Sequence, residues 1–453
     1  MMRISRLFRE LDILGPNRNT RAREQNQEIS LLRGDDCGLD TVSFSGNKSE
    51  KFADVRAELA KNVPDRTTTI EEKQKALSYI ERMLKCSDIT PEMKNYWSNK
   101  KDTIQMEIQS IKNGQQIGKD SGSSKVVQEY RNFIQQRWCD NYPIERNSSL
   151  DFLDSEEYSL TFYNTCFSYL NRILACKDLT DSERSQFTQE INHWNAEKQS
   201  RLGEINWHKQ NNKIKTESYK NVLTEMGNNV PDRTSTLEEK KLASAYIKRM
   251  TLCDDIPQDV KNYWLNKQNV IEMEIQGIKN QRETNSHQKV DDVQKEFSEF
   301  TQKYWVENVL NDKAGLENLA FDDAQEYYFT VRRIMITYCD KILACSDLPR
   351  DLKEKYQEMK IMFKCDLNSY AASSNQHNKM ENKKTESFYD VIDEMRANVP
   401  DSTRTVNEKR LAISYIERML SCDDIPNPEY WQNKLNVIEK ELQALENRGT
   451  RRR

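Results

Sequence analysis

One ten-residue phrase, YIERMLKCSD at residues 79–88, recurs four more times along the chain in closely related form. Every copy places a basic residue three positions after a tyrosine, a cysteine at +7, an aspartate at +9 and Ile or Leu at +10. The cysteines of successive copies are 90, 77, 92 and 77 residues apart. This alternation predicts an array of two unit types in the order A-B-A-B-A. The five cysteines are Cys86, Cys176, Cys253, Cys345 and Cys422.

The residues around each phrase favour helices. The 453-residue chain contains only 12 glycines, which disfavours hairpin-rich β folds and α/β folds with glycine turns. Eight of the ten prolines lie at two recurring corners, so the helix interiors lack the strongest helix breaker. We therefore predict an all-α fold: a tandem array of five three-helix repeats, elongated, and either solenoid-like or a chain of helical bundles.

The pattern divides the chain into segments that we name after the two unit types. Residues 114–125, GQQIGKDSGSSK, have the composition of a flexible linker. The predicted segments are a disordered basic N-terminal segment (1–47), A1 (48–113), B1 (125–214), A2 (215–281), B2 (291–383), A3 (384–447) and a basic tail (448–453).

Capping signals mark where the second helix of each segment is expected to begin. A threonine followed three residues later by glutamate can satisfy two free backbone N–H groups at a helix start. In the B segments an aspartate followed by glutamate at the same spacing predicts the start of the second helix. The A pairs are Thr69–Glu72, Thr236–Glu239 and Thr405–Glu408, and the B pairs are Asp154–Glu157 and Asp323–Glu326.

The repeated cysteine is expected to be a packing residue. Positions 0, +4 and +7 of the phrase share one helix face, so Tyr79, Met83 and Cys86 form an apolar stripe that the cysteine ends. A nucleophilic thiol needs a base or an electropositive site. The chain has only four histidines, and we find none that recurs in the array. We therefore predict that the five cysteines are buried, unpaired and without a metal.

Two further positions of the repeats suggest structural roles. The basic residue lies six residues before the aspartate, and we expect the two to pair and close the corner, as in Arg82 with Asp88. The tryptophan of the phrase NYW begins an apolar stripe on the third helix, which favours the core over a ligand platform. The same pairing is expected for Arg172–Asp178, Arg249–Asp255, Lys341–Asp347 and Arg418–Asp424, and the tryptophans are Trp97, Trp264 and Trp431.

Composition narrows the function without naming one. The net charge of −4 gives no global field that would attract nucleic acid. No run of about 18 apolar residues and no apolar signal-peptide core are present, so we expect a cytoplasmic protein with reduced thiols. No nucleotide-binding, hydrolase or metal-binding motif appears, and we expect no cofactor. The single E-x-x-H, Glu190–His193, is not repeated in B2, where Met359 takes the position of its glutamate.

The phrase NVPDRT is the surface feature that points to function. It joins the first and second helices of the A segments only, whereas the B segments replace it with variable stretches at 139–153 and 306–321. A Pro-Asp turn is good corner chemistry, but three equivalent turns would also offer one contact three times to a multivalent partner. The candidate partner-binding residues are Asn62, Asp65, Arg66, Asn229, Asp232, Arg233, Asn398, Asp401 and Arg404.

Three functions remain open from the sequence. The first is a non-catalytic scaffold or adaptor that binds other proteins through a repeated surface. The second is an enzyme whose site lies in the non-repeated stretches of the B segments. The third is a nucleic-acid or membrane-surface binder that uses the arginine-rich ends, residues 1–33 and 448–453.

Overall fold

The computed structural model describes residues 50–140, 151–283 and 288–450. These residues form 15 α-helices and contain no strand, which confirms the all-α prediction. None of the helices in the described ranges is long and apolar enough to cross a membrane. The predicted N-terminal segment, the basic tail beyond residue 450 and residues 141–150 lie outside the described part of the chain.

The A segments each hold a short, a medium and a long helix. The short helix has 11 residues and ends at the NVPDRT corner. The medium helix has 15 residues and begins after that corner. The helices are α3 (Phe52–Asn62), α4 (Ile70–Leu84) and α5 (Pro91–Gln116) in A1; α10 (Tyr219–Asn229), α11 (Leu237–Thr251) and α12 (Gln258–Glu283) in A2; and α16 (Phe388–Asn398), α17 (Val406–Leu420) and α18 (Pro428–Thr450) in A3.

The B segments hold longer second and third helices. Their first helix runs into wider π-helical turns. The elements are α6 (Ser123–Ile134), η2 (Gln135–Asp140), α8 (Phe152–Leu174) and α9 (Asp181–Asn211) in B1; and α13 (Val290–Thr301), η3 (Gln302–Leu310), η4 (Leu316–Asn318), α14 (Phe321–Leu343) and α15 (Arg350–Met380) in B2. The stretch 306–321 is therefore partly helical rather than a plain loop.

The predicted capping boxes of the A segments are all present. In α4 the Thr69 hydroxyl accepts a hydrogen bond from the backbone N–H of Glu72, and the Glu72 carboxylate accepts from the backbone of Thr69. The same reciprocal bonds begin α11 and α17. Proline is the first residue of α5 and of α18, where its missing N–H costs little.

The capping prediction for the B segments is wrong. Helix α8 begins at Phe152 after Asp151, and α14 begins at Phe321 after Ala320, with no side-chain cap at either start. Asp154 and Asp323 are thus already inside the first turn. They bind lysines of the preceding A segment instead.

The predicted linker at 114–125 is shorter and better anchored than its composition suggests. Helix α5 extends to Gln116 and α6 begins at Ser123. Between them, Asp120 accepts two hydrogen bonds from the Arg172 guanidinium, both at 2.6 Å. This ion pair fixes the connection between A1 and B1.

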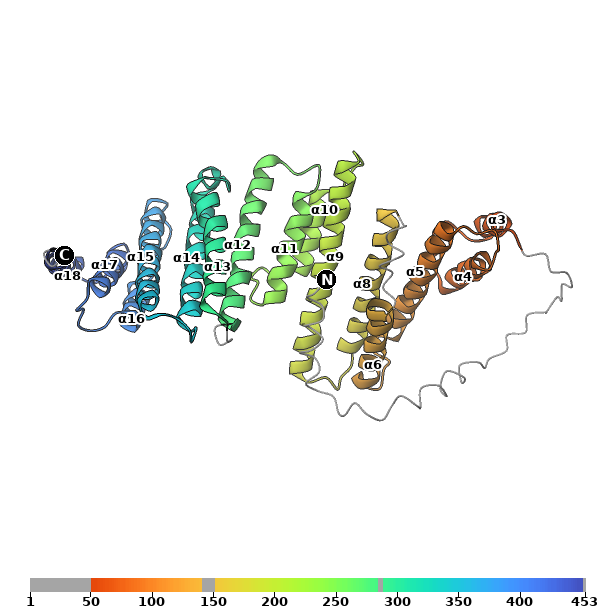
Figure 1. Ribbon diagram of the computed structural model, residues 1–453, viewed down its shortest axis with the longest axis horizontal. Helices are drawn as coiled ribbons and strands as arrows, with labels where there is room; N and C mark the ends of the chain where they lie inside the picture. The colour runs from red at the N-terminus through yellow and green to blue at the C-terminus, as the bar shows by residue number, and fades with distance from the viewer. Residues whose placement is uncertain (1–49, 141–150, 284–287, 451–453) are drawn as a thin grey trace. The chain divides into compact units, whose positions relative to one another are not determined.

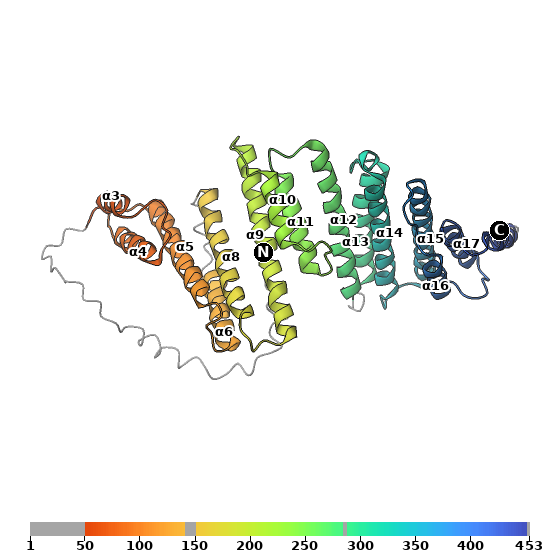
Figure 2. The same cartoon turned by 180° about the vertical axis from the view of Figure 1, so that it is seen from behind.

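The second and third helices pack in one succession along the chain from residue 51 onward. Both views show α8, α9, α11, α12, α14 and α15 side by side (Figures 1 and 2). Third helices contact the second helix of the next segment, as α5 does with α8 and α9 with α11. Each first helix rests on the second helix of its own segment. The core is therefore distributed along the helices instead of gathered at one centre.

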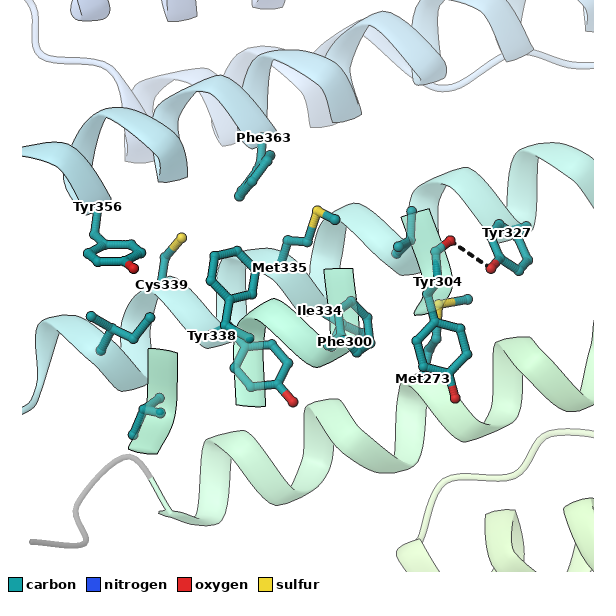
Figure 3. Packing of buried hydrophobic residues seen from close by; sticks show 14 of the residues in the cluster. Met273, Phe300, Tyr304, Tyr327, Ile334, Met335, Tyr338, Cys339, Tyr356 and Phe363 are labelled. Carbon is teal, nitrogen blue, oxygen red and sulfur yellow. Dashed lines mark hydrogen bonds between the residues drawn. The ribbon is translucent and has the colours of Figure 1, made fainter. Parts of the chain in front are cut away.

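The B segments carry the largest apolar clusters. In B2 the side chains of Phe300, Tyr304, Tyr338 and Met335 fill the space between α13, η3, α14 and α15 (Figure 3). The Tyr327 hydroxyl lies in this cluster and donates to the Tyr304 carbonyl at 2.9 Å. Fully buried aromatic side chains of this size contribute much of the apolar area removed from water.

The repeated cysteines lie in the core as predicted, with one difference. Four of the five are buried, while Cys345 is half-buried. Each thiol donates to the carbonyl of the basic residue four positions earlier, at 3.4 Å for Cys86 and 3.7 Å for Cys253. Burial raises the pKa of the Cys253 thiol to about 12 and that of Cys422 to about 11. These thiols are therefore protonated at neutral pH.

Thiol labelling tests this assignment. We expect Cys253 and Cys422 to react with a bulky thiol reagent only after unfolding, because both are at most 2% exposed and protonated. Exposed Cys139 should react at once and serves as the internal control. Mass spectrometry of the folded protein that finds Cys253 and Cys422 modified as fast as Cys139 would contradict the packing role.

Candidate functional site

The NVPDRT corners are exposed, and their residues divide into two groups. The asparagine ends the first helix: Asn62 and Asn229 donate to the carbonyl four residues earlier, at 2.9 and 2.7 Å. The Asp65 and Arg66 side chains are exposed and bond to no described residue, and the same holds for Asp232 and Arg233. In A3, Asn398 makes the same bond as the other asparagines, and Asp401 and Arg404 are exposed.

A buried lysine ties the corner to the third helix in every A segment. The Lys240 ammonium lies 2.7 Å from a Glu274 carboxylate oxygen and donates to the carbonyl and hydroxyl of Thr234, at 3.0 and 3.3 Å. Its side chain is 11% exposed. Lys73 makes the same three bonds in A1, and Lys409 binds the Thr403 hydroxyl and Glu441 in A3. This contact gives the retained threonine of NVPDRT a structural role.

The basic residue of the repeated phrase does not pair with the aspartate six positions later. In A2 the Arg249 guanidinium binds Glu217 at 2.5 Å and Glu225 at 2.8 Å. Gln199 of α9 accepts a further bond from Arg249. The side chain lies on the face of α11 that packs against α9 and α10, so it reaches the carboxylates there. Arg172, Lys341 and Arg418 likewise bind acidic residues before or within the first helix, and Arg82 binds Glu58.

The aspartate instead caps the first helix of its own segment. Asp424 accepts from the Phe388 backbone N–H at 2.7 Å and from the Ser387 hydroxyl at 3.0 Å. These bonds lower the pKa of the Asp424 carboxyl, because they favour its charged form. The aspartates Asp88, Asp178, Asp255 and Asp347 accept from the start of the first helix in the same way. The predicted Arg–Asp pair is therefore wrong. The basic residue binds carboxylates at the first helix, and the aspartate accepts hydrogen bonds from the start of that helix.

Acid should destabilise the fold through these caps. Bonds to the first helix lower the pKa of Asp178, Asp255 and Asp424, so their stabilisation is present above the unfolded pKa and is lost as pH falls through the lower folded value. We expect the free energy of unfolding, measured with urea, to drop below about pH 4. The triple Asp→Asn variant should show a shallower drop, and an unchanged pH dependence would contradict the assignment.

Buried asparagines and a lysine join each A segment to the next B segment. Between α5 and α8, Lys100 pairs with Asp154 and Glu157, and Asn113 donates to the Ser168 hydroxyl at 2.9 Å. Between α12 and α14, Lys267 pairs with Asp323 and Glu326, and Asn280 donates to the Thr337 hydroxyl at 3.1 Å. Sequence reasoning missed these residues, although their recurrence at equal spacing was a usable signal.

Two open grooves lie at equivalent places in A1 and A3. The A1 groove lies between A1 and B1. Its A1 side is lined by Gln74, Leu77, Gln105, Ile108, Gln109 and Lys112, and its B1 side by Glu129, Asn132, Phe133, Gln136, Arg137 and Tyr169. In A3 the positions equivalent to the A1 side are Ile413, Glu439, Leu442, Gln443 and Glu446, which line a groove between α17 and α18. Arg410, the equivalent of Gln74, lines a second groove next to α15 of B2. Leucine or isoleucine forms the floor of both grooves, and long polar side chains form the walls. Such a surface suits a protein or peptide partner more than a small substrate.

The E-x-x-H glutamate and two of the histidines make packing contacts in the part of the chain that the structure describes. Glu190 of the E-x-x-H accepts from the Tyr130 hydroxyl at 2.6 Å, inside the B1 core. The statement that no histidine recurs is wrong, because His208 and His377 lie at equivalent positions and stack on Phe152 and Phe321. Within the described ranges, no group of three or more His, Cys, Asp or Glu side chains is arranged to hold a metal ion.

The tryptophans of the NYW phrase lie against the core, as expected. Trp97, Trp264 and Trp431 are half-buried and pack on the apolar clusters of A1, A2 and A3.

Comparison of the chain with protein-family models, with curated proteins and with solved structures gave no match. A function is therefore inferred from the helices, the corners and the grooves.

Proposed function

We propose that the chain is a non-catalytic scaffold or adaptor, built as an array of five three-helix units in the order A-B-A-B-A, that binds other proteins through a repeated surface. The observation that carries this proposal is that equivalent residues of the second and third helices line an open groove in both A1 and A3. A catalytic site would be expected to break the repeat by gathering polar groups in one enclosed pocket. Repetition of an open groove favours an extended partner or one with several binding motifs.

The exposed corner residues extend this surface. Gln74 of the A1 groove lies in the first two turns of α4, directly after the corner that carries Asp65 and Arg66. The Arg66 and Arg233 side chains bond to no described residue, so a partner can bind them without breaking an internal contact. They are proposed as secondary contacts, which add avidity and not stability.

Affinity capture from native lysate tests the proposal. The variant Lys112→Trp plus Gln443→Trp places a large side chain on the wall of each groove without touching the core, since both residues are exposed. We expect it to lose captured proteins that the unmodified chain retains. The control Lys94→Trp plus Gln432→Trp alters exposed positions of the same helices outside the grooves and should capture the full set.

A second variant separates the corners from the grooves. Arg66→Ala plus Arg233→Ala should weaken capture of the same proteins with little change in melting temperature. The scaffold proposal fails if neither the groove variant nor the corner variant captures less than its control. If the corner variant lowers the melting temperature substantially, the corner arginines are structural and only the grooves remain as binding surface.

A further inference from the structure

The outer face of α18 has residues of a segment joint, but among the described helices only α17 packs closely on α18. In α5 and α12 this face is covered by the next B segment, α8 and α14. The residues that α5 and α12 bury there include Thr103 and Val270, which are 2% and 3% exposed. The equivalent residue of α18 is Val437, which is 55% exposed.

The polar residues of the joint are also retained in α18. The Asn-Lys pair that begins the joint is Asn99–Lys100 in α5 and Asn266–Lys267 in α12. In α18 it is Asn433–Lys434, at the same distance after the tryptophan, and both residues are exposed. A second asparagine follows the first by 14 residues in all three helices, at 113, 280 and 447. One position differs: Met106 and Met273 are buried, whereas α18 has exposed Lys440.

The opposite end of the array does not retain its joint. The second helices of A2 and A3 bury Leu242 and Leu411 against the preceding B segment. The equivalent residue of α4 in A1 is Lys75, which is exposed. In α4, a lysine thus replaces the apolar joint residue. In α18, by contrast, the joint residues Asn433 and Val437 are retained.

The joints inside the chain specify what fits this face. In both joints a lysine of the A segment binds two acidic residues, three positions apart, at the start of the second B helix. Lys100 binds Asp154 and Glu157, and Lys267 binds Asp323 and Glu326. A hydroxyl residue lies 14 positions after the aspartate, Ser168 or Thr337, and accepts from the second asparagine. The sequence of the N-terminal segment, 1–47, contains no acidic pair at this spacing and carries seven arginines.

We infer that the outer face of α18 is a docking site for an amphipathic helix of another protein that begins with Asp-x-x-Glu. A second copy of this chain is disfavoured as the donor, because its own α8 and α14 are packed on α5 and α12. Lys434 would bind the acidic pair, and Val437 would be covered by the apolar stripe of the partner helix. This site adjoins the A3 groove, which Lys440 also lines, and extends the proposed function.

A peptide with the sequence of α14, residues 321–343, serves as the probe because it contains the full pattern. We expect saturable binding of the labelled peptide to the intact chain, measured by fluorescence anisotropy. Lys434→Glu plus Val437→Arg should weaken binding about tenfold or more, since it reverses the charge at the acidic pair and removes the apolar contact. The control Lys248→Glu changes an exposed lysine of α11 and should bind as the unmodified chain does.

A charge exchange distinguishes this site from other peptide contacts. The peptide with Asp323→Lys and Glu326→Lys should bind the Lys434→Glu chain more tightly than the unmodified chain. Circular dichroism and the unfolding midpoint should be unchanged in these variants, because both positions are exposed. The inference is overturned if the peptide does not bind, if Lys434→Glu plus Val437→Arg binds it equally well, or if light scattering shows a self-association that this variant abolishes.

Discussion

The variant Arg249→Ala should be less stable than the unmodified chain by about 2–3 kcal/mol, below the 3–5 kcal/mol typical of a fully buried pair because the carboxylates are partly exposed. The Arg249 side chain is 7% exposed and binds Glu217 and Glu225. Removing it leaves two carboxylates close together without their cation and breaks the bond to Gln199 of α9. Urea unfolding monitored by circular dichroism measures the change.

Arg82 is the matched control for this prediction. It occupies the equivalent position of A1, but its side chain is 36% exposed and binds an exposed Glu58. A surface pair of this kind contributes at most about 1 kcal/mol, so Arg82→Ala should have the smaller effect. Equal effects of the two variants would mean that packing against the preceding B segment does not strengthen the arginine network.

Replacing Lys240 by alanine should destabilise A2 by about 2 kcal/mol, because it leaves Glu274 and the carbonyl of Thr234 without their donor. The lysine is the contact that connects the corner to α12. Lys248→Ala, at an exposed position of the same helix, should change the free energy of unfolding by less than about 0.5 kcal/mol. If Lys240→Ala is equally neutral, the corner is not held by the lysine, and retention of NVPDRT needs another reason.

The local features of the fold could be read from the sequence, because they depend on residues close together in the chain. A capping box needs only a threonine and a glutamate three residues apart, and all three predicted boxes formed. The cysteine stripe followed from helical spacing. The helix content and the starts of α5 and α18 were predictable for the same reason.

Contacts between different helices could not be read in this way. The pairing of Arg82 with Asp88 was inferred from closeness in sequence, but Asp88 turns toward the start of α3 and Arg82 toward Glu58. Burial of Lys240 was not predicted, because charged side chains are usually solvated. Asn266 was passed over for the same reason, since a polar residue rarely marks a buried joint. Comparing the A segments position by position would have found both, because a lysine or asparagine retained in every copy of a unit has a role that solvation does not explain.

The candidate site was predicted in part. The sequence located the corners, and the structure places Asp65, Arg66, Asp232 and Arg233 in solvent. The A1 groove depends on side chains from α4 and α5 of A1 and from α6, η2 and α8 of B1, so no single motif marks it. The open face of α18 could be recognised only after α5 and α12 had shown what a covered joint contains.

Small-angle X-ray scattering tests most directly whether the five segments form one array in series. A compact chain of 453 residues would have a radius of gyration of about 22 Å. An array in series should give a value well above this, together with a linear region in the rod-type Guinier plot that reports a helical-bundle cross-section. A radius of gyration near 22 Å, or the absence of the rod-like region, would show that the segments fold back on one another and would contradict the array.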